Sequence, residues 1–404
     1  MSRRWRLLVG YLVATHLAVY LTFPQFALVP KASSGAMAAM GAGGLISALI
    51  AALVLDSRPV ALRTRLAILG VISLGTFVAP LNISWDEVQV PVAIMAILGT
   101  AGGGTLILLM SCLREVAPRR RQGLYLGGIG AAAYMTANLI LAADAPFDTD
   151  SAMNIATIAA SLGTLAGLVT VATLAIDHWA RPQPAAALAI PPSPTRTTFR
   201  RLARYGAAVL GPLALLVFID SYSFHAMGHA GAYAGSPILR TPTNFIEYGM
   251  LHGFFALLAG ALYPALGRRR LLALAFAAMV VTTTLLALNV VLASGEGVRW
   301  MYSVVIGFYT VVFLSYFADP ISDARPHLAQ AVAIGLTGWI ANPAGIVAIK
   351  CVDAHFADRP LLVFALPIPA AIIGLAWAWR RSRHEPPFGV ESLEMPVPRA
   401  LAKP

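Results

Sequence analysis

The stretch GPLALLVFIDSYSFHAMGHAGAY, from Gly211 to Tyr233, is an apolar segment that contains one carboxylate and two histidines. It is long enough to cross a hydrocarbon core, which takes about 20 mostly apolar residues. A carboxylate inside such a segment costs about 2.5–3.5 kcal/mol on insertion scales, and intramembrane carboxylates are usually functional. Asp220 therefore indicates a membrane span with a polar group that the protein uses.

The composition of the whole chain also indicates a membrane protein. Of its 404 residues, 58% are hydrophobic and 12% are charged, whereas a soluble domain has about 25% charged residues. We expect an all-α membrane protein with twelve spans. The apolar windows lie at about 7–29, 36–55, 66–83, 90–112, 123–143, 154–176, 206–227, 246–266, 271–293, 300–318, 328–350 and 361–379.

The positions of the basic residues orient these windows. The chain carries 29 Lys and Arg residues against 18 Asp and Glu. With the N-terminus inside, the basic residues fall on inner connections, and the exceptions are Lys31, Arg240, Arg299, Lys350 and Arg359. Because cytoplasmic loops are enriched in Lys and Arg, we expect a multi-pass protein of the cytoplasmic (inner) membrane with both termini in the cytoplasm. The lipid bilayer thus accounts for the net charge of +11, and no nucleic-acid partner is needed.

A long inner connection divides the chain into two similar halves. The segment PQPAAALAIPPSPTRTTFRR, rich in Pro, Ala and Thr, reads as a flexible cytoplasmic linker. We predict an N-terminal six-helix half at 1–180, the linker at 181–204, a C-terminal six-helix half at 205–382 and a cytoplasmic tail at 383–404.

One constant shift along the sequence superimposes the two halves. It pairs Ser111 with Ser315, and it pairs His16, inside the first span, with Asp220, inside the seventh. Internal repeats of this kind are typical of secondary transporters.

Three basic turns carry a resemblance to a known family. They read LDSRPVALRTR at 55–65, LGRRRLL at 266–272 and REVAPRRRQG at 114–123. With twelve spans and a long central loop, the chain resembles the major facilitator superfamily over its whole length. The first turn lacks the family's Gly, and the fourth span carries GTAGGG without the Arg of proton-driven members. A drug-exporting branch is not supported, because the fifth span lacks that branch's Gly-Pro element.

The resemblance implies two pseudo-symmetric six-helix bundles around a central cavity that the first, fourth, seventh and tenth spans line. Asp220 would then face water and couple transport to protons, or pair with a basic substrate group; a structural hydrogen bond to a neighbouring Tyr or Ser is the alternative. His16 is its symmetry partner, and we expect the two to face each other across the cavity. Tyr20 lies one turn beyond His16, and His252 could reach Asp220.

Further candidates line or gate the predicted cavity. Tyr302 and Tyr309 recur on one face of the tenth span, where cavity lining and simple packing are equally plausible. Asn138 and Asn342 are equivalent under the same shift, and Asn342 precedes a proline that breaks the helical bonding pattern. Gating candidates are His225, Glu247, Arg63, Arg65, Arg268 and Arg269.

His225 and His229 share one helix face, which would suit a divalent metal if Glu247 or His252 came near. Two histidines alone are a weak signal, so we predict a gating role, no metal and no cofactor.

These features predict a monomeric secondary transporter that moves a small organic solute by alternating access, with H+ as the coupling ion. The chain shows no nucleophile–base pair and no nucleotide-binding loop, so we do not expect an enzyme. Two alternatives remain: a non-transporting sensor or scaffold of the same fold, and an intramembrane transferase built on Asp220 and His225.

Overall fold

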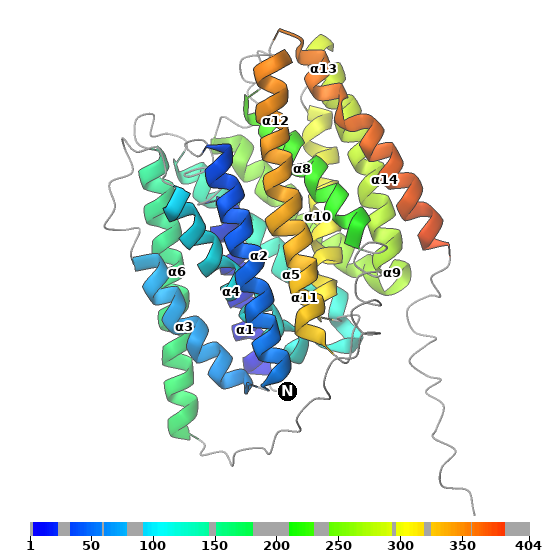
Figure 1. The fold of residues 1–404 in the computed structure, drawn as a ribbon. Helices are drawn as coiled ribbons and strands as arrows, with labels where there is room; N and C mark the ends of the chain where they lie inside the picture. The colour runs from blue at the N-terminus through cyan, green and yellow to red at the C-terminus, as the bar shows by residue number, and fades with distance from the viewer. Residues whose placement is uncertain are drawn as a thin grey trace, which may run out of the picture.

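The computed structural model describes residues 3–22, 33–58, 60–78, 92–144, 151–180, 210–229, 242–292, 296–318, 325–356 and 358–383. These ranges are helical throughout and contain no strand (Figure 1). The elements are α1 (Arg3–Thr22), α2 (Ser34–Ser57), α3 (Leu62–Val78), α4 (Val92–Val116), the 3-10 turn η4 (Arg119–Arg121), α5 (Gln122–Asp144), α6 (Ser151–Ala180), α8 (Gly211–His229), α9 (Pro242–Leu292), α10 (Glu296–Ala318), α11 (Pro326–Ile334), the π-helix η7 (Gly335–Ala341), α12 (Asn342–Phe356), α13 (Pro360–Ala365) and α14 (Pro367–Ser382).

Where the structure describes them, the predicted apolar windows are helical; the window at 328–350 covers α11, η7 and α12, and the one at 361–379 covers α13 and α14. Two windows share α9, which changes direction at Gly267, where φ is 68°. Glycine adopts this left-handed conformation without strain, which explains the Gly in the LGRRRLL turn. Within the described ranges, nine helices are long and apolar enough to cross a membrane. The protein is therefore a multi-pass membrane protein, and the full count of twelve spans stays a prediction.

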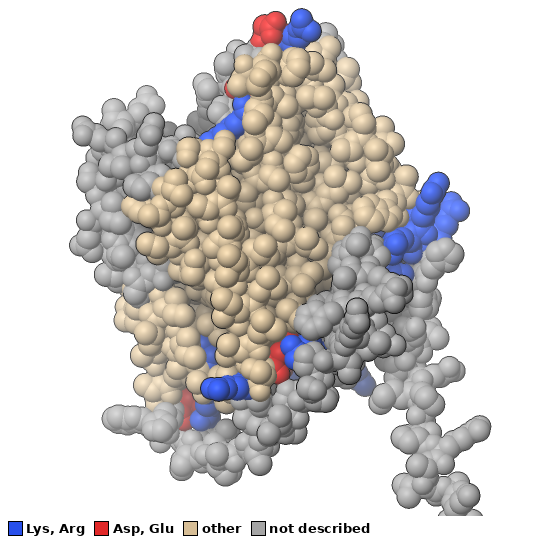
Figure 2. Space-filling view, viewed as in Figure 1, with Lys and Arg blue, Asp and Glu red and all other residues tan. Residues whose placement is uncertain are grey.

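The outer surface of the bundle suits a hydrocarbon environment. Large apolar side chains point outward, and Val71, Ile97 and Ile373 are each more than 60% exposed. Figure 2 shows a broad uncharged band across this face, with the visible Lys, Arg, Asp and Glu residues toward its ends and margin. The linker at 181–204 and the tail at 384–404 lie outside the described residues.

Glycines allow two pairs of helices from different halves to approach closely. Along α5 and the first part of α9, a Cβ on Gly123 would lie 2.3 Å from the Gly260 carbonyl oxygen, and one on Gly127 would lie 2.6 Å from the Ala256 oxygen. Small residues at such contacts let helix backbones pack directly, which drives association in lipid. We call such a line of close glycine contacts a seam. The first seam joins α5 to α9, and the second joins α2 to η7.

The α2–η7 seam depends on a proline. Pro343 has no N–H, so the carbonyl of Trp339, four residues earlier, lacks its usual helical donor. The backbone widens to a π-helix over Gly335–Ala341, where the Asn342 N–H bonds the Thr337 carbonyl. The freed carbonyl of Trp339 faces Gly41 of α2, where a Cβ would lie 2.6 Å from the oxygen. The break predicted at Asn342-Pro343 is thus confirmed, and it lies at a contact between the halves.

The Trp339 ring fills the space that other glycines leave open. A Cβ on Gly44 would lie 2.2 Å from this ring, and one on Gly102 would lie 3.0 Å from it. Gly99 and Gly103 bring α4 against α2, with Cβ positions 2.0 Å and 2.1 Å from backbone oxygens. The glycine run of the fourth span therefore serves close helix approach, as its place inside a span predicts.

This geometry predicts that two glycine-to-alanine substitutions differ in their effect on the free energy of unfolding. Gly44→Ala forces the Trp339 ring to move and should lower the free energy of unfolding by about 1–3 kcal/mol, the usual cost of overpacking. Gly104→Ala is the control, because no atom lies within 4 Å of its Cβ position. Thermal unfolding in detergent measures both variants. Equal unfolding midpoints for the two would contradict the packing described for Trp339.

Candidate functional site

A cavity of about 180 Å³ lies in the middle of the bundle. Residues from α1, α4, α8 and α10 line it, together with α5, α9 and the α11–η7–α12 helix. The four spans expected to line the cavity therefore do so. About half of the lining residues are Leu, Ile, Val, Ala, Met or Phe; the polar ones are Tyr20, Tyr134, Asn138, Asp220, Ser221, His225, His252, Tyr302, Tyr309, Thr310, Thr337 and Asn342.

The cavity is displaced toward the end of the bundle opposite the N-terminus. Its lining continues to Leu21, Leu141 and His225, near the far ends of α1, α5 and α8. In the other direction it stops at Met110 and Phe313, before α4 and α10 end. The helices contact one another beyond that point.

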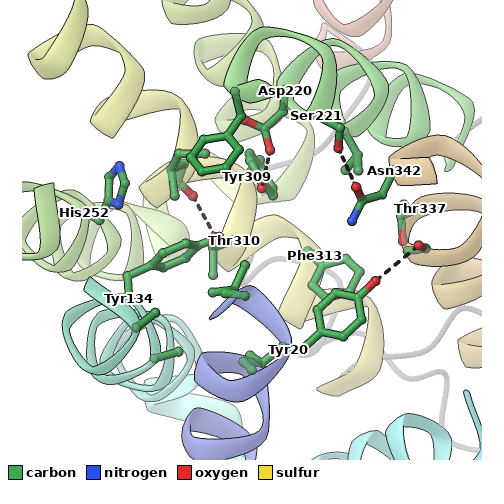
Figure 3. Close-up of a pocket in the computed structure, with 18 of the residues that line it drawn as sticks. Tyr20, Tyr134, Asp220, Ser221, His252, Tyr309, Thr310, Phe313, Thr337 and Asn342 are labelled. Carbon is green, nitrogen blue, oxygen red and sulfur yellow. Dashed lines mark hydrogen bonds between the residues drawn. The ribbon is translucent and has the colours of Figure 1, made fainter. Parts of the chain in front are cut away.

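Asp220 is the one carboxylate in the cavity lining that the structure describes. It is 9% exposed. The Tyr302 hydroxyl donates to its Oδ1 at 2.6 Å, and the Tyr309 hydroxyl donates to its Oδ2 at 2.8 Å. Both phenols come from α10, where a spacing of seven residues places them on one face. Asp220 thus combines the features that both interpretations expected: its carboxylate faces the cavity (Figure 3), and it accepts hydrogen bonds from tyrosine hydroxyls.

Two further hydrogen bonds cross the cavity between the halves. The Thr310 hydroxyl of α10 donates to the Tyr134 hydroxyl of α5 at 3.2 Å. The Tyr20 hydroxyl of α1 donates to the Gly338 carbonyl of η7 at 3.4 Å, and its ring lies edge-on to Trp339. These contacts are long, so the two halves touch lightly at the cavity.

The two symmetry-related asparagines both line the cavity but bond differently. The Asn138 amide donates to the Tyr134 carbonyl at 2.9 Å within α5. The Asn342 oxygen accepts from the Ser221 hydroxyl at 2.9 Å, which links α12 to α8 beside Asp220. The symmetry is closer at Ser111 and Ser315, which each donate to the carbonyl three residues earlier at 2.6 Å.

His252 lines the cavity as predicted, in an aromatic surrounding. Its ring centroid lies 5.2 Å from that of Tyr134, 5.5 Å from Tyr248 and 6.1 Å from Tyr302. Neither ring nitrogen has a hydrogen-bond partner among the described residues, although both are buried. A buried polar group without a partner costs stability, so this histidine is a strong candidate for a functional role.

His16 does not face Asp220, contrary to expectation. Its Nε2 lies 2.8 Å from the Ser73 hydroxyl of α3, and its Nδ1 lies 2.8 Å from the Leu12 carbonyl. Position 16 lies at the edge of the cavity-facing stripe of α1, so its neighbours decide which way it turns. The hydrogen bond with Ser73 turns the His16 ring toward α3, whereas the hydrogen bonds from the two tyrosines of α10 hold the Asp220 carboxylate at the cavity. Tyr20, one turn on, does line the cavity.

The outer gating candidates are divided between two environments. His225 lines the cavity with its ring edge-on to Phe224. Glu247 instead lies on the half-exposed surface of α9, where Arg299 of α10 bonds its carboxylate at 2.9 Å. The side chain of His229 lies outside the described residues. Within those that are described, no three His, Cys, Asp or Glu side chains gather closely enough to hold a metal ion.

The structure does not support a bridging role between the halves for two of the basic gating candidates. Arg63 pairs with Asp177 of α6, and Arg65 pairs with Glu115 and donates to the Ser111 hydroxyl at 2.9 Å. These partners all belong to the N-terminal half. A hydrogen bond between a guanidinium and a carboxylate is charge-assisted and stronger than a neutral one, so these arginines consolidate the N-terminal bundle.

The arginines of the second basic turn lie at the end of the bundle near the N-terminus. Arg268 stacks over the Tyr316 ring at 5.0 Å, which is a contact inside the C-terminal half. Arg269 is partly buried there. Their expected role in gating remains a prediction.

The contact that does join the halves at this end comes from Asp56. Its two carboxylate oxygens accept the backbone N–H groups of His327 at 3.1 Å and Leu328 at 2.9 Å. These are free N–H groups at the start of α11, where the helix dipole also favours a negative charge. One turn further, the Gln330 amide donates to the Phe317 carbonyl at 2.8 Å and to the Met110 carbonyl at 3.4 Å. The two halves are thereby held together below the cavity.

Sequence reasoning missed several of these residues. Tyr134, Ser221, Thr310 and Phe313 lie in the cavity wall, yet each reads in the sequence as an ordinary span residue. Asp56 offered a signal, since it stands in the first basic turn ahead of the arginines. Its partner is a backbone helix end, which leaves no side-chain pattern to recognise.

The environment of His252 predicts an unusual response to mutation. Because His252→Phe removes two buried unpaired nitrogens and keeps the ring, it should preserve the free energy of unfolding or raise it by about 1–3 kcal/mol. Tyr302→Phe is the contrasting variant, since it removes a bond to a buried carboxylate and should be destabilising. Thermal unfolding in detergent compares the two. A similar loss in both variants would show that the histidine has a stabilising partner.

Comparisons with known proteins agree with the architecture. No family model and no curated protein matches the sequence. Solved structures do match. They include the proton:xylose symporter XylE bound to 6-bromo-6-deoxy-D-glucose, at 16% identity over 93% of this chain and 94% of that chain, with a TM-score of 0.59. A double Trp mutant of XylE matches at 13% identity over 93% and 94% of the chains, with a TM-score of 0.60.

A third structure belongs to a protein with a different named substrate. The nucleoside transporter NupG, as a mutant, matches at 16% identity over 94% of this chain and 99% of that chain, with a TM-score of 0.58. At these identities the likeness concerns the fold, which extends over nearly the whole chain. The protein therefore has the fold of the major facilitator superfamily of transporters.

Proposed function

We propose that the protein is a secondary transporter that moves a small organic solute across the membrane by alternating access, coupled to protons. The observation that carries the proposal is the position of Asp220. It lies in a cavity between the two halves, in the interior of a membrane bundle, where a carboxylate is costly and usually functional. Substrate and ion sites of secondary transporters lie in such a position, near the midplane and between repeats.

The contacts around the cavity are consistent with one state of an alternating cycle. Below the cavity, Asp56 accepts hydrogen bonds from the backbone N–H groups of His327 and Leu328, and the Gln330 amide donates to the Met110 carbonyl at 3.4 Å, so these contacts join the halves. In the other direction the lining continues to the far ends of α1, α5 and α8. If the N-terminus is cytoplasmic, this arrangement corresponds to a state closed toward the cytoplasm. Separation of α11 from α2 would open the other path.

Asp220 can serve as the coupling group because its surroundings hold it in place in either protonation state. Two phenols donate to the carboxylate when it is charged. When it is protonated, its hydroxyl becomes a donor and a phenol oxygen can accept in turn, since hydroxyl groups rotate freely. Asp220 therefore keeps hydrogen-bond partners both with and without the proton.

The first test replaces the carboxylate. Asp220→Asn keeps the shape but cannot take up a proton, so gradient-driven accumulation should fall at least about tenfold, the scale of a lost intramembrane charge interaction. The assay uses proteoliposomes with and without an imposed pH gradient, and a panel of D-xylose, uridine, choline and benzyltrimethylammonium as solutes. Tyr302→Phe should lower accumulation less, because Tyr309 still bonds the carboxylate.

The matched control is Asp358→Asn, which removes an exposed carboxylate paired with Arg359 and should transport normally. Undiminished gradient-driven accumulation in Asp220→Asn would refute the coupling role. Ligand binding without flux in the unmodified protein would instead indicate a non-transporting sensor.

The second test addresses closure by Asp56. Asp56→Ala removes the cap of α11, which costs about 1 kcal/mol and should raise the population of the open form about fivefold. A cysteine placed at the cavity floor, Phe313→Cys, reports this opening through its labelling rate with a membrane-impermeant maleimide. Cys112→Ala and Cys351→Ser supply the background.

Ser57→Ala serves as the control, since that hydroxyl bonds only the Val54 carbonyl of its own helix. Equal labelling rates in Asp56→Ala and Ser57→Ala would show that the cap does not hold the halves together.

A further inference from the structure

The cavity differs from a site for a polar solute in both its charge and its hydrogen-bonding capacity. We propose that it binds hydrophobic organic cations, that is, molecules with one positive centre and an aromatic or bulky apolar body. The inference rests on the proposed transport function and names its substrate class.

The charge of the cavity favours a cation. Asp220 supplies a carboxylate, and no Lys or Arg stands among the described residues that line the cavity. Its partners are neutral phenols, so its negative charge has no counter-ion from the protein. A carboxylate has about four acceptor positions and these bonds use two. An ammonium or quaternary group in the cavity would provide the missing positive charge.

The walls of the cavity suit an apolar body. Aromatic rings surround the space near Asp220, and Figure 3 shows Tyr20, Tyr134, Tyr309 and Phe313 around it. The faces of such rings attract cations, most strongly where water is excluded. Aliphatic side chains such as Leu17, Leu106 and Ile306 supply further apolar surface, as in sites for apolar ligands that are oriented by a few polar groups.

The hydroxyl groups of the cavity are already engaged, which disfavours a sugar or a nucleoside. Tyr302 and Tyr309 donate to Asp220, Ser221 donates to Asn342, and Thr337 donates to the Ala333 carbonyl at 2.7 Å. A polyhydroxylated solute gives up many hydrogen bonds to water and needs replacements in the site. Here these four hydroxyl donors are already bonded within the protein, and the ring of His252 leaves one donor in the wall without a partner among the described residues. The similar structures belong to a proton:xylose symporter and a nucleoside transporter, so the proposed substrate class differs from theirs although the fold is shared.

The nearby histidines fit this assignment. His252 lies within the same wall, and its ring is packed by three tyrosines without a hydrogen-bond partner for either nitrogen. A neutral imidazole adds no positive charge to the cavity. His225 lies toward the far end of α8, one turn beyond Ser221. Asp220 therefore remains the group that sets the sign of charge at the centre of the cavity.

The experiment measures binding, which is independent of flux. Purified full-length protein in detergent is titrated calorimetrically with benzyltrimethylammonium, a permanent cation with an aromatic ring. Benzenesulfonate provides an anion of similar size, and uridine and D-xylose provide polar neutral solutes. We expect the cation to bind and the other three to bind at least about tenfold more weakly, because a charge that loses its partner in a low-dielectric site is strongly disfavoured.

Two variants tie the result to the cavity. Asp220→Asn should weaken cation binding at least about tenfold, whereas Asp358→Asn, which removes an exposed carboxylate, should leave it unchanged. If Asp220→Asn unfolds, Phe313→Trp provides the second variant: it fills the cavity floor and should weaken cation binding while Asp220 remains.

The outcomes separate this inference from the transport proposal. Equal or tighter binding of benzenesulfonate, uridine or D-xylose overturns the cation assignment. Cation affinity that is unchanged in both Asp220→Asn and Phe313→Trp overturns it as well. If D-xylose or uridine accumulates in proteoliposomes, the cation assignment fails while transport stands. Selective cation binding without any flux upholds the ligand class and rejects transport.

Discussion

The interaction on which the centre of this protein depends is the pair of hydrogen bonds from Tyr302 and Tyr309 to Asp220. A membrane interior supplies no water to a carboxylate, so any charged group must find its partners inside the bundle. Tyr302 and Tyr309 provide these partners. They are seven residues apart and therefore lie on one face of α10. This arrangement lets one carboxylate persist in a cavity whose other described lining residues are neutral or aromatic side chains without Lys or Arg.

The cavity exists because the helices around it approach closely elsewhere. Glycines let α2, α4 and η7 pack with backbone in contact, and the Trp339 ring occupies the space that Gly44 leaves. Pro343 widens the backbone of η7 and turns a carbonyl toward Gly41. Seams built from small residues give firm contact without side-chain interdigitation. The larger side chains between these seams leave the central space unfilled.

Hydropathy predicted where the described spans lie, because it is a local signal. The family resemblance implied which helices line the cavity and that Asp220 faces it, and both positions agree with the structure. The orientation of His16 was not predictable. Its symmetry with Asp220 holds along the chain, but the direction of its ring depends on Ser73, a partner on another helix. The partners of Arg63 and Arg65 were not predictable for a related reason, and their gating role stays a prediction. Their partners Asp177 and Glu115 lie in the same half, and sequence alone cannot tell a contact within a bundle from one between bundles.

The contacts between the halves differ in how easily they can break. Asp56 binds the exposed N–H groups of a helix start, and water can replace those bonds when α11 moves away. The glycine seam between α5 and α9 has no such substitute, because its backbone contacts lie among apolar residues along the length of both helices. Motion between the halves should therefore pivot on the glycine seams and separate the capped end. In the proposed transport cycle, the acidic cap at the end and the packed seam would together act as a hinge. A small rotation about it would then change which side of the Asp220 cavity is open.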